Sequence, residues 1–150
     1  MSLEKDIHQP KFRSEYHKMT VNLVYTYNWV IEQSRRFFEK ADLTPQQFNI
    51  LRILRGAAKP LSTLQIRQRM LDKMSDTSRI VDRLLKKELV KKVVCKTDRR
   101  LVDITISDKG LDLLKLLDGY NDEMDAQLKG ITEEEAKTLN HLLDKLRSSE

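Results

Sequence analysis

Positively charged side chains, which can bind phosphate groups, gather in one stretch of this sequence. Residues 67–100 contain twelve Lys or Arg and five Asp or Glu, a net charge of +7. Residues 101–150 contain six and twelve of these, a net charge of −6. Positive charge concentrated in this way is typical of a nucleic-acid interface, although a basic surface that only faces solvent has the same composition. The predicted elements that carry the charges favour the nucleic-acid interpretation.

The start of a predicted basic helix carries side chains that could read DNA bases. Residues 75–79 are short or can form hydrogen bonds, as side chains that contact base edges in the major groove must be. Apolar residues follow them at helical spacing: Ile80, Val81, Leu84 and Leu85. A simpler interpretation is that Ser75 or Asp76 caps the helix while the others contact phosphates. We expect base contacts from at least two of these five residues.

Two arginines lie in a predicted hairpin turn. Residues 102–106 alternate apolar and polar side chains, which predicts a half-buried strand, and residues 93–95 form its partner. An arginine at the tip of such a hairpin can enter the minor groove, where a narrow groove strengthens the negative potential; the alternative is a charged turn without a partner. The predicted DNA contacts are Ser62, Thr63, Lys73, Ser75, Asp76, Thr77, Ser78, Arg79, Arg83, Lys86, Arg99 and Arg100.

Local signals predict the elements that position these residues. Thr44, Ser62 and Thr132 are each followed three residues later by Gln or Glu, the pattern of a capping box at the start of a helix. The first two predict helices over residues 45–56 and 63–71, which a polar turn joins to the basic helix. This arrangement is a helix-turn-helix, and with the two-stranded β-hairpin it forms a winged helix. The predicted fold class is mainly α.

Long amphipathic helices are predicted on both sides of the winged helix. Residues 12–40 contain no Gly or Pro and repeat apolar residues at helical spacing, while residues 1–10 are expected to be frayed. Leucine-rich helices are predicted over residues 107–130 and from residue 132 onward. They carry more apolar residues than one small domain can bury, so we expect a second subunit to cover them. The predicted organisation is a winged-helix DNA-binding region at 43–106 and a helical dimerisation region at 11–42 and 107–150.

The composition argues against several other classes of protein. The single cysteine, Cys95, excludes an internal disulfide, fits a reducing compartment, and in a strand is more typical of packing than of redox sensing. His8, His17 and His141 lack metal-ligand spacing, and no catalytic or cofactor-binding motif is present. No apolar run has the length of a signal peptide or a membrane span. We expect a cytoplasmic protein that is not an enzyme and holds no metal or cofactor.

An aromatic cluster in the first long helix could bind a small molecule. Tyr25 and Trp29 stand near Tyr27, with Arg35 and Arg36 further along the same helix. These side chains could line a pocket for a small aromatic or anionic effector. At this spacing, aromatic residues are more often core or subunit contacts, so both interpretations stay open.

The middle of the chain resembles the MarR family of bacterial winged-helix transcriptional regulators. The matching residues are Leu43-Thr44-Pro45-Gln46-Gln47-Phe48 with Leu51 and Leu54, then Ser78-Arg79-Ile80-Val81-Asp82-Arg83-Leu84, Leu89-Val90, Asp98-Arg99-Arg100, Thr105, Ser107 and Gly110. The Asp-Arg-Arg turn, followed by the strand and Ser-x-x-Gly, is the most specific part. Glu88 departs from the pattern, because a glycine usually precedes Leu-Val there.

The resemblance implies a function as well as a fold. It implies a homodimer that binds palindromic double-stranded DNA and represses nearby genes, with recognition helices in successive major grooves and wings in the flanking minor grooves. In the family, the second arginine of the wing can contact the minor groove or pair with an aspartate of the recognition helix, which here would make Asp82 and Arg100 a structural pair between recognition helix and wing. Many members of the family release DNA when an anionic aromatic ligand binds or a cysteine is oxidised.

Two other functions stay open on the sequence alone. One is a winged-helix module that binds an acidic protein surface, and the other is an architectural protein that binds DNA without sequence preference. Only the regulator requires a preferred DNA site. The interaction module needs no affinity for DNA, and the architectural protein would bind DNA with a steep salt dependence.

Overall fold

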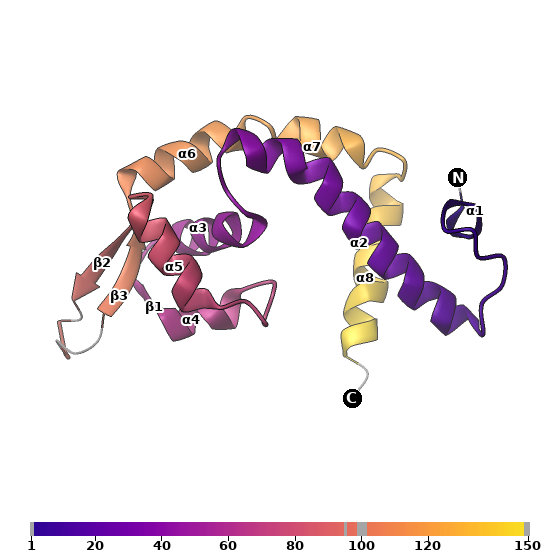
Figure 1. Cartoon of the computed structure of the whole chain (residues 1–150), viewed down its shortest axis with the longest axis horizontal. Helices are drawn as coiled ribbons and strands as arrows, with labels where there is room; N and C mark the ends of the chain where they lie inside the picture. The colour runs from indigo at the N-terminus through magenta and orange to yellow at the C-terminus, as the bar shows by residue number, and fades with distance from the viewer. Residues whose placement is uncertain (1, 95, 99–101, 149–150) are drawn as a thin grey trace.

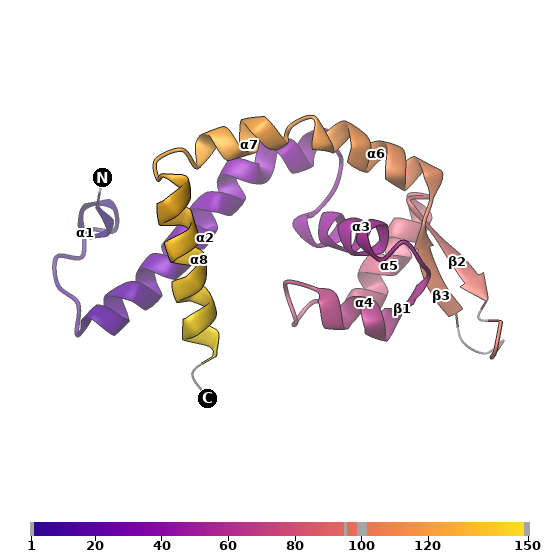
Figure 2. The ribbon, with the colours of Figure 1, turned by 180° about the vertical axis from the view of Figure 1, so that it is seen from behind.

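The computed structural model of the chain describes residues 2–94, 96–98 and 102–148, without the side chain of Arg36. The helices and strands form an arch, with α3 to β3 in one limb, α6 and α7 along its crown, and both ends of the chain in the other limb (Figures 1 and 2). The elements are α1 Leu3–Asp6, α2 Glu15–Lys40, α3 Pro45–Ala57, β1 Leu61–Ser62, α4 Thr63–Arg69, α5 Thr77–Lys86, β2 Val90–Val94, β3 Val102–Ile106, α6 Asp108–Asp118, α7 Asn121–Gln127 and α8 Glu133–Arg147.

The predicted hairpin is present, and a third strand extends it. β2 and β3 pair antiparallel from Val90 opposite Ile106 to Val94 opposite Val102. On its other edge β3 pairs with β1, where Leu61 lies opposite Ile104, so the strand order is β1-β3-β2. The prediction of a two-stranded sheet was therefore incomplete, because a strand of two residues is too short to show a period of two.

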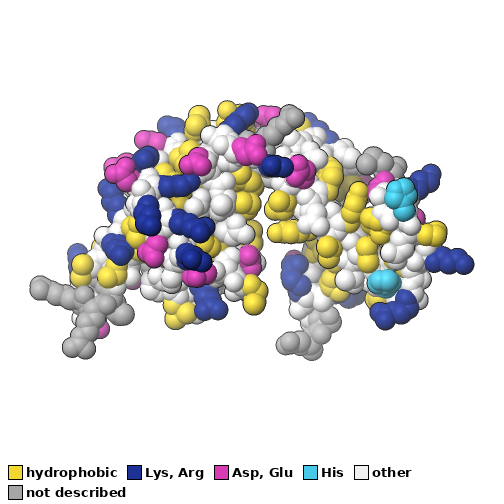
Figure 3. Space-filling model, in the orientation of Figure 1, with side chains coloured by type: hydrophobic (Ala, Val, Ile, Leu, Met, Phe, Trp, Pro, Cys, Tyr) yellow, Lys and Arg dark blue, Asp and Glu magenta, His cyan; other side chains and the backbone are white. Residues whose placement is uncertain are grey.

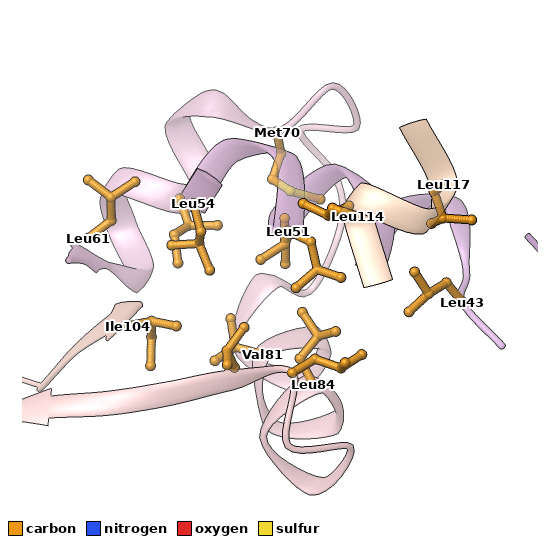
Figure 4. Packing of buried hydrophobic residues seen from close by; sticks show 14 of the residues in the cluster. Leu43, Leu51, Leu54, Leu61, Met70, Val81, Leu84, Ile104, Leu114 and Leu117 are labelled. Atoms are coloured by element: carbon orange, nitrogen blue, oxygen red, sulfur yellow. The ribbon is translucent and has the colours of Figure 1, made fainter. Parts of the chain in front are cut away.

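One hydrophobic core joins the helix-turn-helix, the sheet and α6. Its fully buried side chains are Ile50, Leu51, Leu54, Leu61, Ile66, Met70, Leu84 and Leu114. Figure 4 shows side chains from α3, β1, α5, β3 and α6 pointing into this shared interior. Each fully buried residue of this size contributes about 1.5–3 kcal/mol relative to an exposed one, so α5 is held firmly against α3 and the sheet.

Two leucines of the helix predicted over 63–71 are exposed. Leu64 is 64% exposed and Leu71 is 87% exposed. Leu64 stands two residues before the buried Ile66, which places it about 200° away around the helix axis. The helix also ends at Arg69, and Met70 has an extended backbone, so Leu71 no longer follows the helical period.

A buried junction fixes the end of α5 to the start of α6. The Ser107 hydroxyl donates a hydrogen bond to the Glu88 carbonyl at 2.7 Å and accepts one from the Gly110 N–H at 3.0 Å. A Cβ on Gly110 would lie 2.3 Å from the Leu89 carbonyl oxygen, so only glycine permits this close approach. Glu88 has a φ of 60°, the left-handed conformation that explains why glycine is usual at its position.

The flanking helices differ from the prediction at two places. Residues 1–10 were expected to be frayed, but Leu3 in α1 is buried and Glu4 forms an ion pair with Lys18 at 2.5 Å. The single helix predicted over 107–130 is two helices, α6 and α7, which are separated at Gly119 and Tyr120. The Tyr120 ring lies 6.4 Å from that of Phe37, so packing against α2 accompanies the break.

Much of the apolar surface of α2 and α8 is uncovered. The exposed apolar residues of these two helices are Tyr16, Met19, Val24, Tyr25, Tyr27, Trp29 and Val30 in α2, and Leu139, Leu142 and Leu146 in α8. The three leucines of α8 recur at intervals of three and four residues, so they form one apolar stripe of the kind that is typical of an interface. Within the part of the chain that the structure describes, no helix is long and apolar enough to cross a membrane.

Candidate nucleic-acid interface

α5 presents four of the twelve predicted DNA-binding residues on one exposed face. Val81 and Leu84 point into the core, whereas Ser78, Arg79, Asp82, Arg83 and Lys86 are exposed. The exposed positions recur at intervals of three and four residues, so they lie along one side of the helix. An exposed helical face of about 15 Å with short and basic side chains matches the shape and polarity of the major groove.

Neighbouring residues at the start of α5 lie in different environments. Asp76 is the N-cap, and its Oδ1 accepts a hydrogen bond from the Arg79 N–H at 3.1 Å. Thr77 is only 3% exposed, and its hydroxyl has no hydrogen-bond partner among the described residues. Thr77 is one of the five candidate base contacts, but its side chain faces the interior and is not presented to a groove. Ser78 is the residue at this end of α5 whose hydroxyl faces solvent.

The predicted contacts outside α5 lie near its first turn or in the hairpin. Ser62 caps α4, where its Oγ accepts a hydrogen bond from the Gln65 N–H at 3.2 Å, and Thr63 follows it, half-buried. Lys73 is exposed in the turn before α5, where its ammonium group donates to the Gln68 carbonyl. Ser75 is half-buried in the same turn.

The predicted wing contacts cannot be placed. Arg99 and Arg100 lie outside the described residues, as does Cys95. Of the predicted pair of Asp82 with Arg100, the structure therefore describes only Asp82, which is exposed. The flanking strands β2 and β3 project toward this tip, and Val94 and Val102 beside it are exposed.

Basic side chains dominate the surface around α5. Dark blue Lys and Arg side chains gather over this helix in the limb that contains it (Figure 3). Arg79, Arg83 and Lys86 form no ion pair with any residue that the structure describes, so their charges are available to a ligand. Lys87 differs, because its ammonium group lies 3.0 Å from the Asp42 carboxylate and so ties α5 to the segment before α3.

A small pocket opens between α2 and the helix-turn-helix. It has a volume of about 340 Å³ and is lined by Tyr27, Ile31, Pro45, Gln46, Asn49, Met70, Leu71 and Asp72. Tyr25 and Trp29, the predicted ligand-binding residues, do not line it and lie half-exposed elsewhere on α2. The structure therefore does not bring Tyr25 and Trp29 to this pocket, because helical spacing alone could not show which side of α2 faces α3.

An ion pair connects α3 with the far end of α6. The Arg55 guanidinium donates to both carboxylate oxygens of Asp118, at 2.7 and 3.1 Å. Hydrogen bonding by Arg55, assisted by its charge, lowers the pKa of the Asp118 carboxyl below its ordinary value. This pair was not predicted, since its members are 63 residues apart and each looks like an ordinary surface residue in the sequence.

Comparisons with known proteins agree with the geometry of this surface. A model of the MarR family matches residues 41–101. The HTH-type transcriptional repressor MdtR of Bacillus subtilis is 32% identical over 109 residues, which cover 72% of this chain and 70% of that protein. The HTH-type transcriptional regulator MhqR of the same species is 27% identical over 131 residues, covering 86% and 89%.

Solved structures show the same fold at lower identity. The organohalide-sensing transcriptional regulator RdhR superposes with a TM-score of 0.81 at 24% identity, over 89% of this chain and 80% of that one. RdhR has also been solved with 2,4-dichlorophenol bound. MarR-family regulators bind DNA and act as dimers. The chain belongs to the MarR family of winged-helix transcriptional regulators, which act on transcription and are not enzymes.

Proposed function

We propose that this regulator is a repressor that binds a palindromic operator in double-stranded DNA as a homodimer. The observation that carries this proposal is the exposed face of α5, where Arg79, Arg83 and Lys86 stand beside Ser78 and form no ion pair with any described residue. A rigid core holds that face, so it can dock on DNA without first becoming ordered. The relative MdtR is a transcriptional repressor, which supports repression rather than activation.

The proposed division of labour follows the position of each residue. Ser78 and Arg79 read bases in the major groove, where arginine forms paired hydrogen bonds with guanine. Ser62, Thr63, Lys73, Ser75, Asp76, Arg83 and Lys86 contact phosphates directly or hold the surface that does, and Arg99 and Arg100 enter the minor groove. Residues 43–106 form the DNA-binding region in this proposal.

The helices outside that region support the homodimer. Residues 11–42 and 107–150 contain the uncovered apolar surface of α2 and α8, including Leu139, Leu142 and Leu146 at 44–53% exposure. A second copy of the chain offers the same apolar surface, as a symmetric interface requires. A two-fold axis between the copies would then place two α5 helices on two half-sites.

We also propose that a small aromatic effector releases the regulator from DNA. The pocket between α2, α3 and α4 is mainly apolar, and Tyr27 offers an aromatic face. Among its lining residues in the described part of the chain there is no Lys or Arg, and Asp72 is acidic. A neutral ring therefore fits this lining better than an anionic acid. The phenol bound by RdhR is a ligand of that kind.

Selection of bound duplexes from a random DNA pool, near physiological salt, tests the function. We expect a recovered palindrome with half-sites about one helical turn apart. Arg79→Ala should relax the preference at one or two base pairs, by about 1–3 kcal/mol for each lost contact. Lys86→Ala should weaken all sequences alike and reduce the salt dependence. Lys115→Ala, which removes the same charge from the exposed side of α6, is the matched control and should change neither.

The same selection separates the regulator from the two other functions. DNA recovered without an enriched motif would contradict the proposal in favour of an architectural protein. Recovery of no DNA by a folded dimer would favour a module that binds protein.

A further inference from the structure

Two exposed apolar side chains converge beside the first turn of α5. Leu64, in the first turn of α4, is 64% exposed, and Met74, in the turn before α5, is 92% exposed. Both line one concavity of about 500 Å³, together with Thr63, Arg67 and Ser78. The two apolar residues therefore come from different elements but face the same space.

Neither side chain contributes to the folded core. Single exposed apolar residues are ordinary on protein surfaces and need no explanation. Here the two flank a hollow whose other lining groups include the hydroxyls of Thr63 and Ser78 and the guanidinium of Arg67. Arg67 and Asp76 balance each other in charge, so the hollow fits a partner that presents an apolar group beside hydrogen-bonding groups.

DNA offers one apolar group of this kind in the major groove. Each thymine presents its C5-methyl group there, beside the hydrogen-bonding edges of the bases, whereas unmodified cytosine, adenine and guanine present no methyl group. Phosphates on either side of the groove supply the negative charge that Arg67 and Arg79 would meet. Burying a methyl group against leucine and methionine is favourable because it removes apolar surface from water.

We propose that Leu64 and Met74 form a contact site for thymine C5-methyl groups and so determine part of the sequence preference. The inference rests on the proposed binding of DNA by α5. Ser78 and Arg79 read their base pairs by hydrogen bonds. At the neighbouring base pairs, shape and apolar contact would determine the sequence preference instead.

Replacing thymine by deoxyuridine tests this contact, because the change removes the methyl group and leaves the base-pairing and hydrogen-bonding edges intact. The probe is the duplex recovered by random-pool selection, with deoxyuridine placed at one thymine at a time. We expect at least one thymine per half-site where the change weakens binding about fourfold, the effect of one buried methyl group. Leu64→Ala and Met74→Ala should each reduce this discrimination toward equal binding of the two duplexes.

Leu116→Ala is the matched control, since Leu116 is also a helical leucine at 64% exposure but lies on α6. It should leave the thymine–uracil discrimination unchanged, and circular dichroism should show all variants folded. Equal affinity of the wild-type protein for every thymine and deoxyuridine duplex would overturn the inference while leaving operator binding intact. Discrimination that persists in both alanine variants would also overturn it. Failure to bind any duplex would reject the proposed function together with the inference.

Discussion

Apolar residues at helical spacing are buried in the central region but exposed in the flanking helix α8. In the central region Ile50, Leu51 and Leu84 are completely buried. In α8, Leu139 and Leu142 stand 47% and 53% exposed, although they follow helical spacing equally well. The first pattern is a finished core, and we interpret the second as one side of the proposed subunit interface. The stability of the central core should therefore be independent of protein concentration, whereas burial of the leucines of α8 should depend on a partner.

Leu84→Ala should have the largest effect, because it opens a cavity in the completed core beneath α5. We expect a loss of about 2–5 kcal/mol in the free energy of unfolding, measured by chemical denaturation. Leu116→Ala provides the comparison at an exposed site and should change stability by less than about 0.5 kcal/mol. Similar small losses for both variants would contradict the description of a finished core.

Leu142→Asp should disrupt the proposed subunit interface at the exposed leucines of α8. A carboxylate at a buried position of the proposed interface would be unpaired, so the subunits should associate about a hundredfold more weakly or worse. Sedimentation equilibrium over a range of concentrations measures this change. Asn140→Asp adds the same charge to an exposed position of α8 about 160° around the helix axis from Leu142, and should leave association nearly unchanged. Equal effects of the two substitutions would point to net charge rather than to the apolar surface.

Thr77→Val should make the central region more stable. The Thr77 hydroxyl is buried and unpaired among the described residues, so its replacement by a methyl group should add about 1–2 kcal/mol to the free energy of unfolding. The operator preference should stay the same, whereas Ser78→Ala on the exposed side should alter it. A changed preference in the Thr77 variant would restore this residue as a base contact.

Protonation of Asp118 should have the smallest effect. Its pKa is lowered in the folded chain by Arg55, so the stabilisation by this pair is present above the unfolded pKa, near 3.8, and is lost as pH falls through the lower folded value. Because both groups are partly exposed, the contribution at neutral pH should stay below about 1 kcal/mol. The stability difference between wild type and Asp118→Asn should thus disappear in acid. Asp112→Asn, a second exposed aspartate on α6, serves as the control.

Local sequence signals predicted the parts of the fold that depend on interactions between residues close together in the sequence. Capping boxes at Thr44, Ser62 and Thr132 are all present, because their hydrogen bonds join residues three apart. The period of two at residues 102–106 likewise predicted β3 and its pairing with β2. These interactions need no knowledge of distant residues.

The errors concern tertiary packing. The inward orientation of Thr77 depends on how α5 rests on the core, and β1 exists because Leu61 meets Ile104 from 43 residues away. The choice of Tyr27 rather than Tyr25 for the pocket depends on which side of α2 faces α3. The free basic face of α5 was predictable, since its residues are neighbours on one helix.

The mass of the protein–DNA complex tests the central claim most directly. Native mass spectrometry of the selected palindrome with wild-type protein should show two chains on each duplex, and Leu142→Asp should shift the population toward free DNA. Inserting five base pairs between the half-sites rotates them by about half a helical turn and should also abolish the two-chain complex. A stable complex of one chain per duplex, or one indifferent to the insertion, would contradict a regulator that binds as a symmetric dimer.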